Sequence, residues 1–499
     1  MCSISGIIAK GCCLDVRYSL DMMKILKHRG KDGSGLYVDD DVYYFKEGLD
    51  KDNLKLDKTF FISFGHNRLA IVGRYLQPIS NEDESLWVIC NGEIYNYIEI
   101  MNELKEHTFK TDSDSEVILH LYEDKALYRL DGDYAYAIYD KKKNILILGR
   151  DRFGVKPLFY VDTDKYFAFS SERKALYHLL ININKEKKDL DYLNSKIKRL
   201  KPNSYLIYYL DNLRYEIIEK EIVKNSPELN ISYNKAVDYL DKILKKAVYK
   251  RVRGLDRVGV ICSGGLDSSL IAYYSSKYVN TTLYAVGTED SEDLKYAQKL
   301  ANYLNLELKT YIINENEFEE HLFKVVKALD DINLLNLSVG IPIYLSTKLA
   351  KEDKLKVVLS GQGADEIFGG YKRHENSENL KEELIKDIKN LYKVNLERDD
   401  HCSMANTIEL RVPFLDSELV DFSLSLPESY LKGELRKKIL RDVAKKYLPE
   451  DIALRPKKAA QYGTKSEKMI YKVAKKYGFS KKNINKFLEF LKEKYWFIE

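Results

Sequence analysis

The chain has 499 residues and a mass of 58.1 kDa, which predicts two domains because single domains usually hold about 100–200 residues. Apolar residues make up 45% and charged residues 32%, as in an ordinary globular protein. The 81 Lys and Arg residues nearly balance the 77 Asp and Glu residues, and the formal net charge is only +4. We therefore expect no nucleic-acid partner and no membrane partner, since nothing drives electrostatic binding to either.

The cysteines predict a reducing compartment. The six residues Cys2, Cys12, Cys13, Cys90, Cys262 and Cys402 form no CxxC pair and no zinc-finger spacing. No apolar run reaches the roughly 18 residues of a membrane span. The N-terminal segment has no basic region before its apolar residues, so it does not fit a signal peptide. We expect a cytoplasmic protein.

The first 210 residues indicate short strands with few long helices, which is typical of a layered α+β sandwich. Two segments, 18–27 and 115–123, have helical periodicity. The segment 211–231 has mixed charges and is interpreted as a linker. The expected strands are Ser3–Ala9, Val42–Phe45, Phe60–Phe64, Trp87–Cys90, Tyr134–Tyr139, Ile145–Leu148, Leu158–Val161 and Tyr166–Phe169.

From Ser232, a candidate helix N-cap, strands and helices alternate. Alternation of this kind predicts a doubly wound α/β parallel sheet with extra helices, with ligands at the carboxyl ends of its strands. The expected domains are therefore 2–210 and 232–499. Within the second domain, the expected strands are 258–262, 282–287, 306–313 and 356–359.

The segment 258–269 joins a buried strand to a helix through a turn of small polar residues. Gly264 and Gly265 allow backbone N–H groups to approach an anion, and the helix N-terminus favours negative charge. Ser263 and Ser268 offer hydroxyl donors, and Asp267 is a candidate Mg²⁺ ligand. The Lys of a Walker loop is absent, so the loop favours binding of ATP with pyrophosphate as leaving group.

A second turn of this type follows the strand near 357–359. Asp365 and Glu366 lie in it, and both loops would end at the carboxyl edge of the sheet. Asp365 is therefore expected to complete the metal site with Asp267. Paired acids at a helix start also occur simply as helix caps, and this alternative stays open.

Cys2 is a candidate N-terminal nucleophile. After removal of Met1, its thiol would lie beside its own α-amino group, whose ordinary pKa is about 7.7–8.0 and which can act as general base. A buried strand cysteine is the alternative interpretation.

Five motifs favour the nucleophile over the buried strand cysteine. They are Cys2–Ile7, Arg29–Gly35, Gly65–Ile71, Asn91–Asn96 and Thr111–Ile118. In this order they resemble the N-terminal glutamine amidotransferases, with their N-terminal nucleophile hydrolase fold. The resemblance implies that Arg68 binds the glutamine α-carboxylate, that Asp114 and Glu93 bind its α-ammonium, and that Asn91 and Gly92 form the oxyanion hole. Leu69, Ala70, Ile71 and Val72 complete the implied glutamine site.

With the second domain included, the chain resembles the glutamine-hydrolysing asparagine synthetase family, whose C-terminal domain is of the ATP pyrophosphatase type. Further shared motifs are 131–137, 151–157, 395–400 and 409–416. The resemblance implies glutamine, aspartate and Mg·ATP as substrates, with ammonia passing through an internal tunnel. It adds Cys262, Val286, Ser360 and Gly361 to the ATP site, and Lys457 as a catalytic lysine with Lys458 as fallback.

Three segments depart from that family. Gln362 stands where the family has a catalytic glutamate, and Leu335–Ser338 align with its acceptor-binding stretch but lack its arginine. The segment 456–463 is closer to a divergent branch of the family. The sequence therefore leaves open another carboxylate as acceptor, and also a non-catalytic glutamine or ATP sensor. A homodimer is possible.

Overall fold

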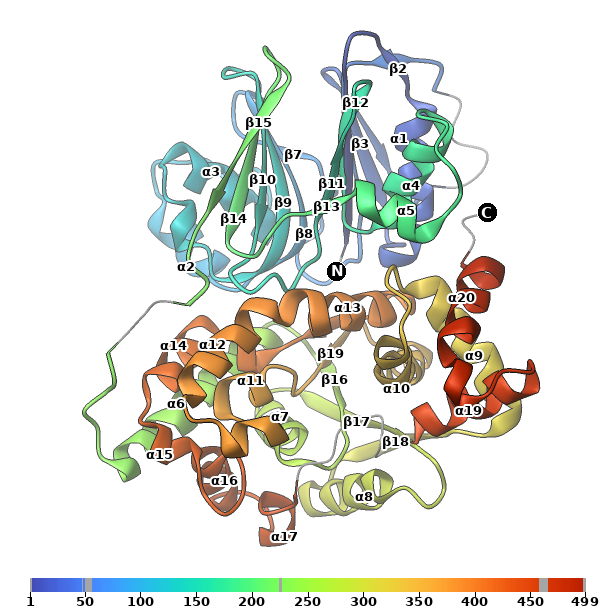
Figure 1. Ribbon diagram of the computed structural model, residues 1–499. Helices are drawn as coiled ribbons and strands as arrows, with labels where there is room; N and C mark the ends of the chain where they lie inside the picture. The colour runs from blue at the N-terminus through green and yellow to red at the C-terminus, as the bar shows by residue number, and fades with distance from the viewer. Residues whose placement is uncertain (1, 47, 50–55, 224–226, 457–464, 497–499) are drawn as a thin grey trace. The chain divides into compact units, whose positions relative to one another are not determined.

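The computed structural model describes residues 2–46, 48–49, 56–223, 227–456 and 465–496 (Figure 1). The chain forms two compact units, one ending at Ile222 and the other beginning at Val223. We call them the N-terminal unit and the C-terminal unit. Among the described residues, no helix combines the length and the apolar character that crossing a bilayer requires.

The N-terminal unit contains two antiparallel sheets. The larger has the order β13-β11-β12-β1-β6-β3-β4 and the smaller the order β15-β14-β10-β9-β8-β7. The bounds in the larger sheet are β1 Ser3–Ala9, β3 Ser34–Val38, β4 Asp41–Phe45, β6 Ile62–Asn67, β11 Phe159–Asp162, β12 Tyr166–Ser170 and β13 Lys198–Arg199. Those in the smaller sheet are β7 Ile79–Ser80, β8 Leu86–Ile94, β9 Gly132–Asp140, β10 Ile145–Arg150, β14 Ser204–Tyr209 and β15 Arg214–Glu219. A short pair, β2 Leu14–Asp15 and β5 Thr59–Phe60, lies outside both sheets.

The two sheets pack face to face, and helices cover their outer faces (Figure 1). Ile4 and Phe64 of the larger sheet share a buried core with Leu148 of the smaller one. Helices α1 (Arg17–Ile25), α4 (Arg173–Asn182) and α5 (Leu190–Lys196) flank the larger sheet, and α2 (Tyr97–Glu103) and α3 (Val117–Glu123) the smaller one. The predicted layered α+β sandwich is therefore confirmed, with four layers.

Two segments of this unit differ from the expectation. The predicted strand Phe60–Phe64 is divided between β5 and β6, with Phe61 exposed between them. Strand β15 lies within the segment expected to be a linker. It pairs with β14 at the edge of the smaller sheet, and five of its six residues are exposed. An edge strand without a buried face carries no apolar alternation, so its sequence resembles a linker.

The C-terminal unit is built on a parallel sheet of order β18-β17-β16-β19-β20, which confirms the predicted doubly wound α/β fold. Helices α8 and α10 lie on either side of this sheet (Figure 1). The strands are β16 Arg257–Ile261, β17 Asn280–Gly287, β18 Glu307–Ile312, β19 Val357–Leu359 and β20 Glu409–Arg411. The helices around the sheet are α6 Tyr233–Val252, α7 Leu266–Ser275, α8 Glu292–Leu304, α9 Glu315–Ala328, α10 Leu334–Glu352, α11 Ala364–Phe368, α12 Leu380–Leu391 and α13 Glu397–Met404. They continue with α14 Ser417–Ser425, α15 Glu428–Leu431, α16 Lys438–Lys445, α17 Glu450–Ala453, α19 Ser466–Lys476 and α20 Ile484–Tyr495.

The strand order of this sheet places the two polar loops side by side. The chain runs outward from β16 to β18 on one side, then returns to β19 and β20 on the other. The order therefore reverses between β16 and β19, and a doubly wound sheet opens a ligand crevice at such a point. The loops after these two strands are 262–265 and 360–363.

Candidate active sites

The candidate nucleophile Cys2 lies at the start of β1 and is held by three separate segments. Its backbone nitrogen donates to Asn91 Oδ1 at 3.1 Å, and its carbonyl accepts a hydrogen bond from Arg29 Nε, also at 3.1 Å. Its Sγ lies 4.0 Å from the carbonyl oxygen of Leu69. The thiol is therefore fixed between the expected oxyanion residue Asn91 and the expected glutamine loop.

Asn91 has one amide atom engaged and the other available. Its side chain is fully buried on β8, and among the described residues Nδ2 has no hydrogen-bond partner. The next residue, Gly92, has a φ of +150°, and a Cβ there would lie 2.1 Å from the carbonyl oxygen of Asp133. Only glycine fits this backbone. A buried donor without an acceptor suits an oxyanion that forms only during a reaction.

The expected glutamine loop, Arg68–Val72, follows β6 directly. The Arg68 side chain donates to the carbonyl groups of Val72 and Gly73, and Asp32 Oδ2 accepts the Ala70 N–H at 2.8 Å. Arg68 also lines a cavity of about 510 Å³ together with Asp32. The described lining of this cavity contains neither Cys2 nor Asp114.

Asp114 belongs to a different segment from the Arg68–Val72 loop, and it contacts the end of β8. It begins the 3-10 turn η2 (Asp114–Glu116), is buried, and accepts the Ile94 N–H on Oδ2 at 2.8 Å. Glu93 is also buried, one residue earlier on the strand. The structure thus brings Asp114 to the strand that carries Asn91 and Glu93.

Sequence reasoning gave no role to a buried ion pair behind Cys2. Arg29 Nη1 lies 2.7 Å from Glu172 Oε1, and both side chains are fully buried. Burial would raise the pKa of Glu172, but the neighbouring His28, Lys174 and Arg29 hold that pKa well below its usual value. Arg29 therefore remains a fixed donor to the Cys2 carbonyl. In the sequence, Arg29 stands out only as the first residue of the motif Arg29–Gly35. The motif does not indicate Glu172 as its partner, so no function could be assigned to Arg29.

The C-terminal unit has its own cavity, of about 190 Å³, at the reversal point of the sheet. Helix α7 begins there at Leu266, after the N-cap residue Gly265. Among the described residues no side chain caps its N-terminus, so its backbone donors are available at the cavity. A Cβ on Gly361 would lie 2.8 Å from Asp267 Cβ, so the two loops pack as closely as glycine allows. All predicted ATP-site residues except Gly264 line this cavity: Cys262, Ser263, Gly265, Asp267, Ser268, Val286, Ser360 and Gly361.

A lysine from a distant segment joins the two expected metal ligands. Lys437 Nζ lies 2.8 and 2.7 Å from the two carboxylate oxygens of Asp267, and 2.6 Å from Asp365 Oδ1. Two carboxylates that converge on one ammonium group are also suited to bind a hard divalent cation such as Mg²⁺. In the sequence, Lys437 lies among other lysines with nothing to distinguish it. Lys457 and Lys458, the predicted catalytic lysine and its fallback, lie outside the described residues.

Gln362 lines the same cavity, with a carboxyl group behind it. Glu366 Oε1 accepts hydrogen bonds from Tyr371 Oη at 2.5 Å and Asn395 Nδ2 at 3.1 Å, and lies 3.5 Å from Gln362 Nε2. Burial and the neighbouring Asp365 raise the pKa of Glu366 to about 7. A carboxyl group that exchanges protons near neutral pH, that of Glu366, therefore lies beside Gln362.

The expected acceptor-binding stretch, Leu335–Ser338, forms the first turns of α10. These four residues do not line the described cavity, whereas Val339 and Pro342, which follow them, do. The stretch is thus next to the cavity rather than in its wall.

Comparison with known proteins assigns both units. Residues 1–210 match the model of the glutamine amidotransferase domain, and residues 239–381 and 372–484 match that of asparagine synthase. Over 99% of both chains, the sequence is 60% identical to "Putative asparagine synthetase (glutamine-hydrolyzing) 1" of Methanocaldococcus jannaschii. The chain belongs to the asparagine synthetase family. This confirms the resemblance carried by the motifs.

More distant members of the family align over most of their length. Asparagine synthetase B of Escherichia coli is 30% identical, with 92% of this chain and 81% of that protein covered. The asparagine synthetase of Rattus norvegicus is 32% identical, with 94% and 85% covered. Among solved structures, the glutamine phosphoribosylpyrophosphate amidotransferase of Bacillus subtilis is 16% identical with a TM-score of 0.36, covering 72% of this chain and 81% of that one.

Proposed function

We propose that this protein is a glutamine-hydrolysing asparagine synthetase of the cytoplasm. In this reaction glutamine, aspartate, ATP and water give glutamate, asparagine, AMP and pyrophosphate. The observation that carries the proposal is the presence of two complementary sites in one chain. Cys2 lies beside a buried amide donor, Asn91 Nδ2, and a phosphate loop faces the converging carboxylates of Asp267 and Asp365.

The N-terminal unit would release ammonia. With Met1 removed, the α-amino group of Cys2 takes the thiol proton, and the thiolate attacks the glutamine carboxamide. Asn91 Nδ2 and the Gly92 N–H donate to the oxyanion of the tetrahedral intermediate. Ammonia leaves with the returned proton, and water hydrolyses the thioester to glutamate. Arg68 and Asp114 are the proposed partners of the substrate's α-carboxylate and α-ammonium.

The C-terminal unit would activate aspartate. The loop 262–265 and the uncapped start of α7 bind the phosphates of ATP. A side-chain oxygen of aspartate attacks the α-phosphorus, and pyrophosphate leaves. Ammonia then attacks the acyl carbon, loses a proton, and displaces AMP. Mg²⁺ held by Asp267 and Asp365 would neutralise phosphate charge, and Lys437 supplies a further positive charge at the same place.

Pyrophosphate release tests the proposal. Purified protein is given Mg·ATP and glutamine with aspartate, with each of a panel of other small carboxylic acids, or with no acid. We expect release that depends on aspartate and is matched by asparagine formation. Glutamine hydrolysis without aspartate-dependent release would overturn the acceptor assignment, and the panel would identify the acid used instead. Absence of both activities would favour a sensor.

A further inference from the structure

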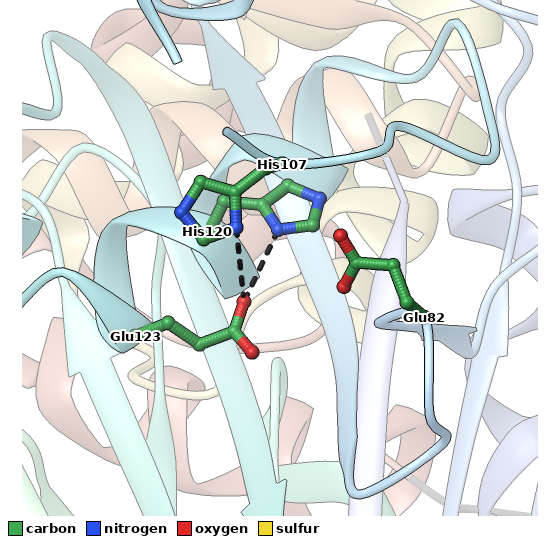
Figure 2. A group of neighbouring side chains, drawn as sticks. All are labelled: Glu82, His107, His120 and Glu123. Carbon is green, nitrogen blue, oxygen red and sulfur yellow. Dashed lines mark hydrogen bonds and ion pairs between the residues drawn. The ribbon is translucent and has the colours of Figure 1, made fainter. Parts of the chain in front are cut away.

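A group of imidazoles and carboxylates lies in the N-terminal unit, outside both candidate active sites (Figure 2). It consists of Glu82, His107, His120 and Glu123, and we call it the His–Glu cluster. One possible ligand atom from each residue can be chosen so that all four lie within 4.8 Å of one another. His120 and Glu123 are three residues apart on α3, Glu82 lies in the β7–β8 hairpin, and His107 follows α2. The cluster thus joins three segments.

The two imidazole rings of the cluster both approach the same oxygen atom of Glu123. Glu123 Oε2 lies 3.1 Å from His120 Nδ1 and 3.6 Å from His107 Nδ1, and the two rings are 4.6 Å apart between centroids (Figure 2). In a tetrahedral site with bonds of about 2.0–2.1 Å, neighbouring ligand atoms are about 3.3–3.4 Å apart. The observed separations bracket that value.

Three members also have an outer hydrogen bond that fixes their orientation, and the fourth, His120, has a carboxylate nearby. His107 Nε2 lies 3.1 Å from Asp124 Oδ1, and His120 Nε2 lies 3.6 Å from Glu116 Oε1. The outer oxygen of Glu123 accepts from Asn81 Nδ2 at 3.0 Å, and an oxygen of Glu82 accepts from the Thr108 N–H at 2.8 Å. Carboxylates behind ligating imidazoles are the usual outer shell of protein metal sites.

The geometry of the cluster suits a divalent cation at its centre. Glu123 Oε2 faces the Nδ1 atoms of both His120 and His107. A cation held between these atoms accepts lone pairs from the carboxylate and from both nitrogens. The carboxylates of Glu82 and Glu123 balance the charge of one divalent ion.

We propose that the His–Glu cluster binds one divalent transition-metal ion, with Zn²⁺ as the best match. Mixed imidazole and carboxylate ligands suit Zn²⁺ better than Mg²⁺ or Ca²⁺, which prefer oxygen alone. Glu82 and Glu123 are exposed, so the ion can enter from solvent, whereas His120 is fully buried. The ion would tie the hairpin and the loop after α2 to α3, close to the turn that carries Asp114.

Metal titration of the full chain tests this proposal. The background is Cys12→Ser/Cys13→Ser, because those two thiols are exposed and would bind zinc themselves. Protein stripped with a chelator is titrated with Zn²⁺ in competition with a chromophoric chelator, and with Co²⁺ monitored by visible absorption. We expect one tight equivalent, and the intense bands of tetrahedral Co²⁺.

The variants locate the site. His107→Gln/His120→Gln should abolish the tight equivalent. His178→Gln, in which the altered histidine lies outside the cluster on α4 beside Asp21, should retain it. Glu116→Gln, behind His120, should weaken Zn²⁺ binding by about 10–100-fold. If the double variant does not fold, the exposed Glu82→Gln and Glu123→Gln replace it. The proposal is overturned if no tight equivalent binds, or if binding is unchanged in the cluster variants.

Discussion

Asn91→Ala should lower kcat strongly without a comparable loss in the free energy of unfolding, and the structure gives the size of both effects. The substitution removes the Nδ2 donor, and loss of one oxyanion donor typically lowers kcat by about 10²–10³-fold, or about 2.7–4 kcal/mol. It also removes the 3.1 Å hydrogen bond from the Cys2 nitrogen, worth about 0.5–1.5 kcal/mol. Against this loss, a buried donor without a partner among the described residues disappears, which relieves about 1–3 kcal/mol. The free energy of unfolding should therefore lie between about 0.5 kcal/mol below and about 2.5 kcal/mol above that of the parent enzyme.

The assay compares glutamine hydrolysis with urea denaturation. Asn67→Ala is the matched control, because Asn67 is equally buried but its amide makes three hydrogen bonds, to Ser3, Met23 and Ser34. At about 1 kcal/mol each, that control should lose about 3 kcal/mol of stability. A kcat within a few-fold of the parent enzyme, or a stability loss in Asn91→Ala as large as in the control, would refute the reasoning.

Three further outcomes are expected. Cys2→Ala should abolish glutamine hydrolysis while ammonia-supported asparagine formation continues; loss of both would contradict separate sites. Lys437→Met should lower the free energy of unfolding in urea by about 3 kcal/mol, because Asp267 and Asp365 lose their buried counter-ion; a change below about 1 kcal/mol would contradict this. The pKa of Glu366 is raised to about 7 from an ordinary 4.5, so its contribution to stability is complete below about pH 4.5 and is lost as pH rises through 7. Glu366→Gln should therefore show a smaller fall in stability between about pH 5 and about pH 8, and an unchanged pH dependence would argue against the shift.

Features of this chain that depend on local geometry could be predicted from its residues. An apolar strand followed by Ser263, Gly264 and Gly265 specifies a tight turn into a helix, because small residues and glycine allow that backbone. Strand β1 lies between the bounds predicted for it, Ser3 and Ala9. The alternation of strands and helices after Ser232 was enough to predict the parallel sheet.

Contacts between side chains that are far apart in the sequence could be identified only in the folded chain. Lys437 contacts Asp267 across 170 residues, and Asn91 contacts Cys2 across 89. The four members of the His–Glu cluster come from three segments, and no motif links them. Such contacts follow from strand order, register and the packing of helices on the sheets, which are set by the burial of the whole core. A lysine in a lysine-rich stretch, or a histidine in a loop, gives no local sign of the carboxylates that it will face.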